Sequence, residues 1–198
     1  MNDFYYSEKP VSEIKEKEFT DTCAGKLLKL ISVSGVFSFE NRIDKASRLL
    51  IENFKPTGNT VLDVGCGYGA IGLFIKTIYP ELSVTMVDIN ERAVKYSKIN
   101  AERNYLQVRV IKSDLYSGVE SEKFRDIVTN PPIAAGKKVV ERLIRESKQH
   151  INPGGSLWLV AFHNKGGSSY KKTMQEVFNN VQDVVKKGGI RLYRSILM

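Results

Sequence analysis

The sequence has few of the features that mark membrane, secreted or metal-binding proteins. Its 198 residues include only two cysteines, Cys23 and Cys66, and their spacing matches no metal site. The longest apolar runs, such as 157–162, have the length of a strand and fall far short of the roughly 20 residues that span a bilayer. Segment 1–10 is polar and charged, unlike a secretory signal. We therefore expect a cytoplasmic protein with no membrane partner and no metal.

Charge of the two signs is balanced over most of the chain but not at its end. Lys and Arg number 9 against 9 Asp and Glu in residues 1–60, 9 against 9 in 61–130, and 12 against 4 in 131–198. The net charge of +8 therefore comes from the last third. A one-sided basic surface suits a polyanion such as a nucleic acid. The alternative is a solvated surface that keeps the protein in solution.

Short apolar runs alternate with amphipathic stretches after residue 43, and this pattern predicts an α/β domain over 44–198. Helices are expected over about 44–54, 70–79, 91–100, 138–149 and 170–178, and strands within 61–64, 84–87, 108–111, 127–128, 157–162, 181–185 and 190–196. Alternation of this kind favours a seven-stranded, mostly parallel sheet with helices on both faces. The last two strands have no helix between them, so they should form a terminal antiparallel hairpin.

Residues 1–43 are predicted to be a short N-terminal extension. Leu27 to Phe39 favours a β-hairpin that turns at Ser34-Gly35. Residues 11–30 otherwise show no regular apolar period. Asp44 is expected to cap the helix that ends near Phe54.

A glycine motif, VLDVGCGYG over 61–69, follows the first strand of the domain. Gly65, Gly67 and Gly69 allow a tight turn and close approach of a ligand to the backbone. Ligands of such sheets bind beyond the carboxyl ends of the strands. The spacing departs from the dinucleotide fingerprint, and Asp63 would repel a pyrophosphate but suit an ammonium and a sulfonium. An ordinary glycine turn is the alternative.

Acidic residues end the next two strands. Asp88 follows the glycines by about 20 residues, where a carboxylate accepts hydrogen bonds from ribose hydroxyls. Asp114, in Ser113-Asp114-Leu115, can accept from an adenine amino group, and Ile89 and Leu115 can sandwich the ring. Separately, Asp88 could cap a helix and Asp114 could belong to a turn. Their order at successive strand ends favours a cofactor that contains a nucleoside.

These motifs resemble class I S-adenosylmethionine-dependent methyltransferases over about residues 35–198. The resemblance implies a Rossmann-like fold with S-adenosyl-L-methionine as cofactor. It assigns the methionine part to the glycine loop, the ribose to Asp88 and the adenine to Asp114. The cofactor-binding residues that it implies are Asp63, Gly65, Cys66, Gly67, Gly69, Asp88, Ile89, Asn90, Ser113, Asp114, Leu115 and Asn130.

Asn130-Pro131-Pro132-Ile133 ends the fourth strand, beside the predicted cofactor crevice. The two prolines remove two backbone donors, which leaves the Asn130 side-chain oxygen and the Pro131 carbonyl as acceptors. Acceptors can hold the N–H bonds of an amine so that its lone pair faces a methyl carbon, and they stabilise the charge that develops on nitrogen. A strand-ending turn is the alternative.

This run resembles motif IV of amino-directed methyltransferases, with Ile133 in place of an aromatic residue. Together with Gly35-Val36-Phe37-Ser38 and Asp44, it resembles the methyltransferase small domain family, which includes ribosomal RNA guanine-N2 methyltransferases, and within it the short, stand-alone members of archaeal type. The resemblance implies that Asn130, Pro131, Pro132 and Ile133 are catalytic. It also implies an RNA substrate, with guanine N2 of ribosomal or transfer RNA as the acceptor.

Other residues and other functions remain open at this stage. Phe37 is a candidate for substrate contact or a core residue, and Lys137 and Lys138 are candidates for phosphate contacts or a solvated helix start. His163 is expected to be a bystander. The alternative acceptors are a protein glutamine and a small-molecule amine. A non-catalytic cofactor-binding RNA module and, less favoured by the glycine spacing, a nicotinamide oxidoreductase are the other classes. A monomer or weak dimer is expected.

Overall fold

The computed structural model describes residues 8–198. Its strands, in chain order, are β1 (Glu16–Cys23), β2 (Lys26–Val33), β3 (Thr60–Val64), β4 (Ser83–Asp88), β5 (Arg109–Lys112), β6 (Phe124–Thr129), β7 (Ile151–Phe162), β8 (Gln182–Lys187) and β9 (Ile190–Ile196). Its α-helices are α1 (Lys45–Asn53), α2 (Ala70–Ile78), α3 (Glu91–Arg103), α4 (Lys137–Ser147) and α5 (Ser168–Phe178). These elements confirm the predicted alternation of strands and helices.

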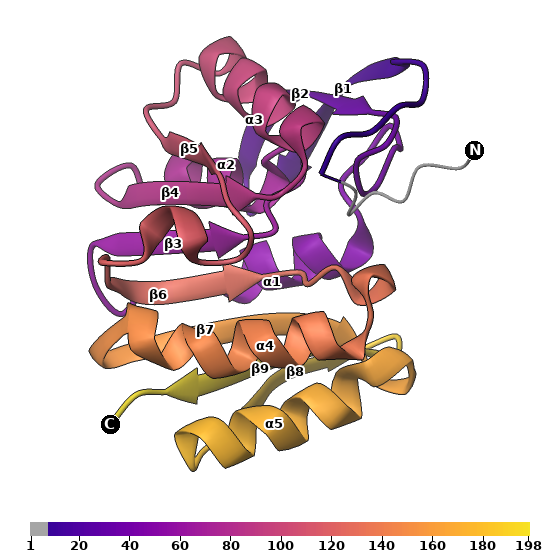
Figure 1. Cartoon of the computed structure of the whole chain (residues 1–198). Coiled ribbons are helices and arrows are strands. Elements are labelled where there is room, and N and C mark those ends of the chain that lie inside the picture. The colour runs from indigo at the N-terminus through magenta and orange to yellow at the C-terminus, as the bar shows by residue number, and fades with distance from the viewer. Residues whose placement is uncertain (1–7) are drawn as a thin grey trace.

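The described residues form a seven-stranded sheet in the order β5-β4-β3-β6-β7-β9-β8 (Figure 1). The strands from β5 to β7 pair in parallel, whereas β9 pairs antiparallel with both β7 and β8. This is the predicted Rossmann-like sheet with its terminal antiparallel hairpin. The chain runs outward from β3 to β5 and then returns to β6, so a topological switch point lies between β3 and β6. Ligands of open α/β sheets bind at such a point.

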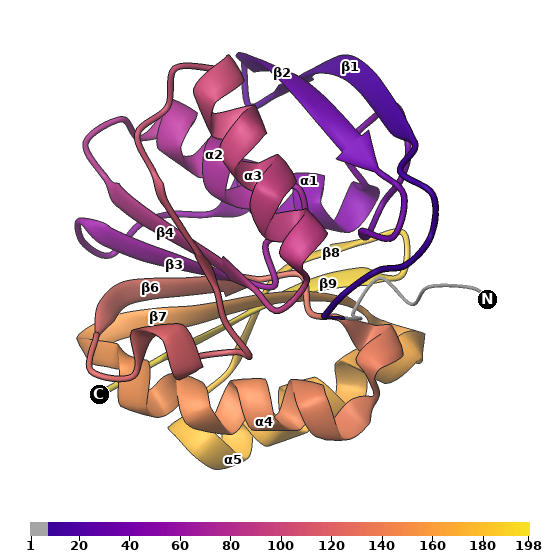
Figure 2. The ribbon, with the colours of Figure 1, turned by 45° about the horizontal axis from the view of Figure 1, so that its top comes forward.

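Helices cover both faces of the sheet, as Figure 2 shows, with α1, α2 and α3 on one face and α4 and α5 on the other. Each face has its own apolar core. Leu50, Phe74 and Tyr96 belong to the first, and Leu143 and Met174 belong to the second. The central strands are buried on both sides, as parallel strands require. Among the described residues, no helix has both the length and the apolar character needed to cross a bilayer.

The predicted N-terminal hairpin was placed wrongly. The hairpin pairs β1 with β2 and turns at Ala24-Gly25, whose φ angles are 49° and 74°. Two successive positive φ values match the twist of a two-residue hairpin. Ser34-Gly35 instead follows β2. The carbonyl oxygens of Ser34 and Gly35 accept hydrogen bonds from Arg92 and Asn90, respectively, at the start of α3. Residues 34–39 therefore form a loop rather than a second strand.

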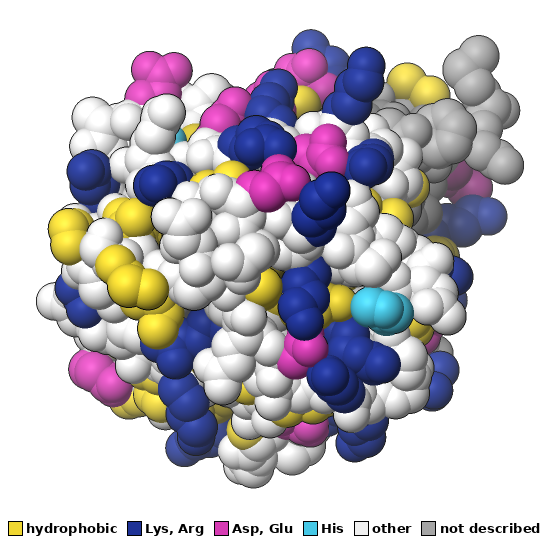
Figure 3. All heavy atoms as spheres, turned by 90° about the horizontal axis from the view of Figure 1, so that it is seen from below, with side chains coloured by type: hydrophobic (Ala, Val, Ile, Leu, Met, Phe, Trp, Pro, Cys, Tyr) yellow, Lys and Arg dark blue, Asp and Glu magenta, His cyan; other side chains and the backbone are white. Residues whose placement is uncertain are grey.

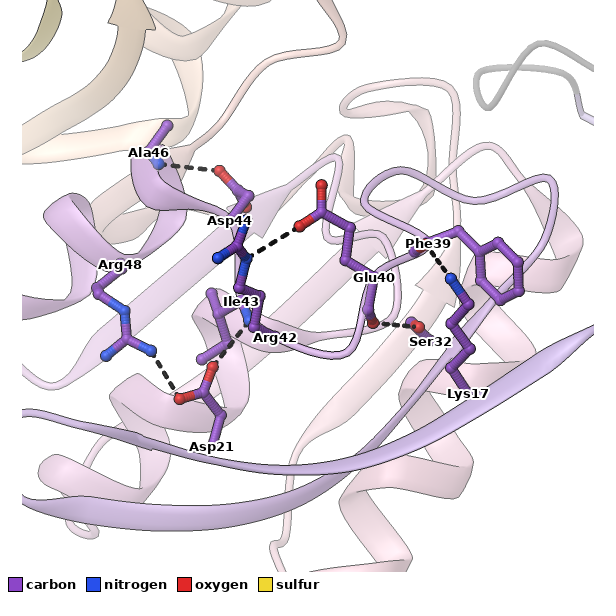
Figure 4. A network of polar contacts seen from close by, with 10 residues as sticks. All are labelled: Lys17, Asp21, Ser32, Phe39, Glu40, Arg42, Ile43, Asp44, Ala46 and Arg48. Carbon is purple, nitrogen blue, oxygen red and sulfur yellow. Dashed lines mark hydrogen bonds and ion pairs between the residues drawn. The ribbon is translucent and has the colours of Figure 1, made fainter. Parts of the chain in front are cut away.

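The hairpin packs on the first core and fixes the loop before α1 (Figure 4). Asp21 accepts a hydrogen bond from the Ile43 N–H at 2.8 Å and pairs with Arg48 of α1 at 2.7 Å. Ser32 of β2 donates to the Glu40 carbonyl at 2.8 Å. The helix then begins at Asp44, whose Oδ1 accepts from the N–H groups of Ala46 and Ser47, as predicted. These contacts hold segment 36–47 against the carboxyl edge of the sheet.

Candidate functional site

A cavity of about 340 Å³ lies at the carboxyl ends of β3, β4, β5 and β6, at the switch point of the sheet. It lies between the loop before α1 on one side and helix α4 on the other. Its walls are formed by Val36, Phe37, Val64, Gly65, Gly67, Val87, Asp88, Ile89, Ser113, Asp114, Leu115, Asn130, Pro131, Pro132, Ala135, Val139 and Leu143. The topology thus brings together predicted residues that are up to 95 positions apart in the chain.

The glycine loop after β3 is folded so that its backbone forms one wall of the cavity. The N–H groups of Gly65 and Cys66 both donate to the Val87 carbonyl, at 2.9 and 3.0 Å, which ties the loop to the end of β4. Gly65 and Gly67 have φ angles of 74° and 58°, where L side chains are disfavoured. A Cβ on Gly65 would lie 3.7 Å from the Pro132 ring across the cavity. Glycine therefore keeps this space open.

Asp88, at the end of β4, connects the glycine loop with the start of α3. Its Oδ2 accepts a hydrogen bond from the Gly67 N–H at 2.8 Å, and its Oδ1 accepts from the Asn90 N–H at 2.9 Å. Burial raises the pKa of Asp88 to about 6, although these backbone N–H groups oppose the shift. Each carboxylate oxygen has a further lone pair. Asp88 can therefore still accept hydrogen bonds from hydroxyls of a ligand in the cavity.

Asp63 lies beneath the glycine loop and does not line the cavity, although the sequence predicted a carboxylate that faces the loop. Its side chain is fully buried, and Oδ2 accepts from the Gly72 N–H of α2 at 2.9 Å. Oδ1 is buried with no hydrogen-bond partner. Burial raises the pKa of Asp63 to about 7; the Gly72 N–H opposes this shift and the charge of Asp88 adds to it. A cation on the loop would favour the ionised form of Asp63.

The third strand end contributes Ser113, Asp114 and Leu115 to the wall, opposite Ile89. The Ser113 hydroxyl is occupied locally, donating to the Leu115 carbonyl and accepting from the Gly118 N–H, both at 2.8 Å. The Asp114 carboxylate is half-exposed and forms an ion pair with Arg142 of α4. To bind a ligand, the Asp114 carboxylate must therefore either accept from Arg142 and the ligand together or release Arg142. The sequence did not indicate this ion pair.

Besides Asp63, four residues predicted to bind the cofactor or to be catalytic lie off the wall of this cavity. Cys66 is buried against Ser97, and burial raises the pKa of its thiol. Gly69 begins α2 with a φ of 95°. Asn90 is the N-cap of α3 and donates to the Gly35 carbonyl at 2.8 Å. Ile133 packs against the second core, and Ala135 faces the cavity instead. These four residues support the walls rather than form them.

Asn130 follows β6, and its side-chain amide has a defined orientation. Nδ2 donates to Ser47 Oγ at 3.0 Å and to Asp44 Oδ1 at 3.3 Å, both at the start of α1. The described residues donate no hydrogen bond to Asn130 Oδ1, so this oxygen is the acceptor that remains. The Pro131 carbonyl, predicted to be a second acceptor, already accepts from the Ile133 N–H at 2.8 Å. It retains one lone pair.

A second, much smaller recess adjoins the cavity and shares Phe37, Gly65, Gly67 and Asn130 with it. Its volume of about 20 Å³ has room for roughly one small group. Polar side chains gather around it: those of Ser38, Asp44, Ser47, Tyr68 and Asn130. The Tyr68 and Ser38 hydroxyls are buried without a hydrogen-bond partner.

Sequence analysis did not identify several residues that line the recess beside Asn130. Ser47 and Tyr68 were not singled out, and Asp44 was expected only to cap α1. A polar side chain at the first buried turn of a helix was the available signal for Ser47, and the position within the glycine motif was the signal for Tyr68. Their proximity to Asn130 depends on how α1 docks on β6 and β7, which no local pattern encodes.

The three residues predicted to contact substrate lie at different places. Phe37 is 39% exposed and borders both the cavity and the recess. Lys137 and Lys138 are exposed at the start of α4, outside both, and Lys137 lies 3.5 Å from Glu141. His163 follows β7, with its Nδ1 3.2 Å from the Tyr193 hydroxyl, and lines neither the cavity nor the recess.

A larger hollow of about 830 Å³ lies at the opposite edge of the sheet, at the amino ends of β3 to β6. Its rim carries charged side chains of both signs, including Lys76, Glu81 and Arg109. Because the glycine loop and the strand-end carboxylates all lie at the carboxyl edge, the smaller cavity is the candidate site.

The residues around this cavity fit S-adenosylmethionine. The backbone of Gly65 and Gly67 leaves room that a Cβ would fill. Asp88 offers acceptors for hydroxyls, and Asp63, buried beneath the loop with an unpartnered Oδ1, would ionise in response to a cation bound on the loop.

Comparisons with known proteins agree with this fold. A family model described as "Methyltransferase small domain" matches residues 27–194. The Bacillus subtilis (strain 168) protein named "Uncharacterized protein YbxB" is 40% identical over 199 residues, which cover 98% of each chain. Ribosomal RNA small subunit methyltransferase C of Vibrio parahaemolyticus is 33% identical over 181 residues, which cover 89% of this chain and 52% of that protein.

A solved structure is also similar: the T. thermophilus 16S rRNA N2 G1207 methyltransferase (RsmC) in complex with AdoMet and guanosine. The TM-score is 0.82 at 25% identity, over 96% of this chain and 52% of that chain. The chain thus spans about half the length of the ribosomal RNA methyltransferases that it matches. Fold and relatives define the class as S-adenosylmethionine-dependent methyltransferases. Within that class, the chain belongs to the methyltransferase small domain family.

Proposed function

We propose that this protein transfers the methyl group of S-adenosylmethionine to the exocyclic N2 amine of a guanine in ribosomal RNA. The observation that carries the proposal is the orientation of Asn130, whose amide donates to Ser47 and Asp44 and so leaves its oxygen as an acceptor beside the cavity. The similarity to ribosomal RNA small subunit methyltransferase C supports the choice of RNA and of guanine N2.

We assign the cavity to the cofactor. Gly65 and Gly67 would hold its methionine part through the backbone, Asp88 would accept from the ribose hydroxyls, and Ile89 and Leu115 would enclose the adenine. Asp114 would accept from the adenine amino group after sharing its carboxylate with Arg142. When bound, the cofactor supplies a methyl group on a positively charged sulfur.

Asn130 would act on the amine. Its Oδ1 accepts one N–H of the amine, which turns the nitrogen lone pair toward the cavity and stabilises the positive charge that develops on nitrogen. The remaining lone pair of the Pro131 carbonyl can accept the second N–H. No strong base is needed, because the proton can leave to solvent after transfer. The paired prolines limit the competing backbone donors at this position.

A basic surface at the same edge supports RNA as the substrate. A groove of about 490 Å³ lies between α1 and the β8–β9 hairpin and is lined by Lys45, Arg48, Leu49, Glu52, Phe162, Lys187, Gly188 and Ile190. Phe162 ends β7, the parallel neighbour of β6, so the groove lies at the edge that carries Asn130. Phe162 is 38% exposed, with the Lys165 ammonium 5.6 Å from its ring. Exposed aromatic rings and lysines bind unpaired nucleotides.

The face on the side of α5 and the C-terminal strands carries more Lys and Arg than Asp and Glu side chains, and the acidic side chains lie among the basic ones (Figure 3). This agrees with the 12 basic and 4 acidic residues after Asn130. We infer that the RNA backbone lies across this side while an unpaired or flipped guanine enters beside Phe37.

The test is incubation with methyl-labelled S-adenosylmethionine and, separately, total RNA, total protein and small amines. We expect label in ribosomal RNA as N2-methylguanosine. Asn130→Ala should bind the cofactor normally yet lose activity by about 100-fold or more, whereas Asn164→Ala, an exposed control at the same edge, should behave as wild type. Label in protein glutamine alone, or full activity in Asn130→Ala, would defeat the proposal.

A further inference from the structure

The recess beside Asn130 is a built polar site that the transfer of a methyl group does not by itself explain. Tyr68 is 3% exposed, yet its hydroxyl has no hydrogen-bond partner, and the buried Ser38 hydroxyl is likewise unpaired. Leaving a buried hydroxyl unpaired costs stability. The Ser38 hydroxyl lies close enough to Tyr68 to affect its pKa, yet neither hydroxyl forms a hydrogen bond of good geometry, so a ligand in the recess can pair with both.

Asp44 gives the recess a charged acceptor. Its Oδ1 accepts from Ala46 N–H, Ser47 N–H and Asn130 Nδ2, at 3.0, 3.0 and 3.3 Å. The described residues donate nothing to its Oδ2. Burial, and after it the negative charge of Asp44, raises the pKa of Tyr68, while the neighbouring Ser38 hydroxyl lowers it; the net shift is upward, so the phenol keeps its proton and can donate. The recess therefore offers a carboxylate acceptor on one side and hydroxyl donors on the other.

The recess is too small for a whole base ring, but it can hold the polar edge of a base. About 20 Å³ admits the polar edge of a base, while the ring itself would lie against Phe37, which borders both spaces. Guanine places an N1–H donor on one side of its C2 amine and the N3 acceptor on the other. Adenine instead places an N1 acceptor beside its C6 amine, and that lone pair would face the carboxylate of Asp44.

We propose that Asp44 selects guanine by accepting its N1–H through Oδ2, while Tyr68 and Ser38 supply donors for N3. The inference rests on the proposed function, because it takes the amine held by Asn130 as the N2 amine. Asp44 thus has two tasks: its Oδ1 caps α1 and holds the Asn130 amide, and its Oδ2 reads the base.

The test measures nucleoside binding to the protein saturated with S-adenosylhomocysteine. Guanosine should bind about tenfold or more tightly than adenosine, and than 1-methylguanosine, which lacks the N1–H. Asp44→Asn keeps a capping oxygen but replaces the free acceptor with a donor. This variant should lose the preference for guanosine and gain affinity for adenosine. A wild-type protein that binds 1-methylguanosine as well as guanosine, or an Asp44→Asn variant that keeps the guanosine preference, overturns the inference.

Tyr68→Phe is a second variant that separates loss of binding from loss of folding. Removal of an unpaired buried hydroxyl should leave the melting temperature unchanged or raise it, yet guanosine binding should weaken. Unchanged binding would contradict the assignment of Tyr68. The two proposals fail in different ways: if N2-methylguanosine forms in RNA at the wild-type rate with Asp44→Asn, only the reading of Asp44 is wrong. If the label appears in another kind of molecule, the proposed function is wrong.

Discussion

The Oγ atom of Ser47 lies 3.0 Å from Nδ2 of Asn130, although 83 positions separate the two residues in the sequence. Ser47 is buried in the first turn of α1, and Asn130 follows β6 at the switch point of the sheet. The hydroxyl accepts from the amide nitrogen and helps to hold it, while the Asp44 carboxylate, which can only accept, fixes which end of the amide faces the cavity. A flipped amide would present donors to the substrate amine, which itself needs acceptors.

Ser47→Ala should therefore slow methyl transfer without removing any group that contacts substrate. We expect kcat to fall about 3- to 10-fold, the value of one neutral hydrogen bond, because Asp44 still holds the amide at 3.3 Å. Steady-state kinetics with RNA, together with calorimetry for the cofactor, will measure this. The cofactor Kd should not change, and Ser121→Ala, at an exposed serine, should match wild type. A raised KM with unchanged kcat would contradict an orienting role for Ser47.

The space between Gly65 and Pro132 gives a second prediction. Gly65→Ala adds a methyl group 3.7 Å from the Pro132 ring, inside the cavity, at a φ of 74°. The positive φ should cost about 1 kcal/mol of unfolding free energy, and the methyl group should weaken cofactor binding by about tenfold or more.

Gly25→Ala is a matched control, because Gly25 also has a φ of 74° but no atom lies within 4 Å of the added Cβ. Urea denaturation should give similar losses of stability for both variants, whereas calorimetry should show weak cofactor binding only for Gly65→Ala. Equal cofactor affinities in the two variants would rule out the glycine loop as the binding wall.

The arrangement of strands and helices after residue 43 follows from local patterns. Run 157–162 is apolar on both faces, so it predicts a central strand, and Asp44 marks the start of α1. The hairpin was mislocated because β1 carries few apolar residues and turns at Ala24, which adopts a positive φ that alanine disfavours. Strand pairing across the turn and packing of the hairpin on the first core stabilise it.

The site was predicted as far as it depends on strand ends. Gly65, Asp88 and Asn130 follow neighbouring strands and therefore meet at one edge. The pairing of Asp114 with Arg142, the burial of Asp63 and the contact of Ser47 with Asn130 depend instead on how helices dock on the sheet. Contacts of this kind link distant segments, and no local period in the sequence records them.

Cofactor affinity should depend on pH through the two buried carboxyl groups. The pKa of Asp63 is raised from 3.8 to about 7 and that of Asp88 from 3.8 to about 6. Compared with the unfolded chain, the folded protein without cofactor therefore favours the protonated forms of both carboxyl groups. The stability that their protonation contributes is lost as pH rises from about 4 through 7. A ligand with a positive charge and hydroxyl donors favours the ionised forms instead.

We therefore expect cofactor binding to tighten from about pH 5 to about pH 8 and to release protons. Calorimetry in buffers with different ionisation enthalpies will count those protons. In Asp88→Asn the step near pH 6 should disappear, and the step of Asp63 should remain but move to lower pH, because the charge of Asp88 no longer raises the pKa of Asp63. Affinity that is flat over this range in the wild type would mean that neither carboxyl group senses the ligand.

The groove beside Phe162 should set the salt dependence of RNA binding. Lys45 and Lys187 are exposed on its rim, and no acidic side chain among residues 8–198 forms an ion pair with either. Each lysine that neutralises a phosphate contributes about 0.7 to the slope of log K against log salt for a single strand. The double variant Lys45→Gln/Lys187→Gln should therefore lower that slope by about 1.4, as measured by fluorescence anisotropy with a labelled RNA over a salt series. Lys26→Gln/Lys123→Gln removes the same charge from exposed positions away from the groove and should leave the slope unchanged. If both double variants lower the slope equally, the net charge of the protein binds the RNA and the groove has no special part in binding.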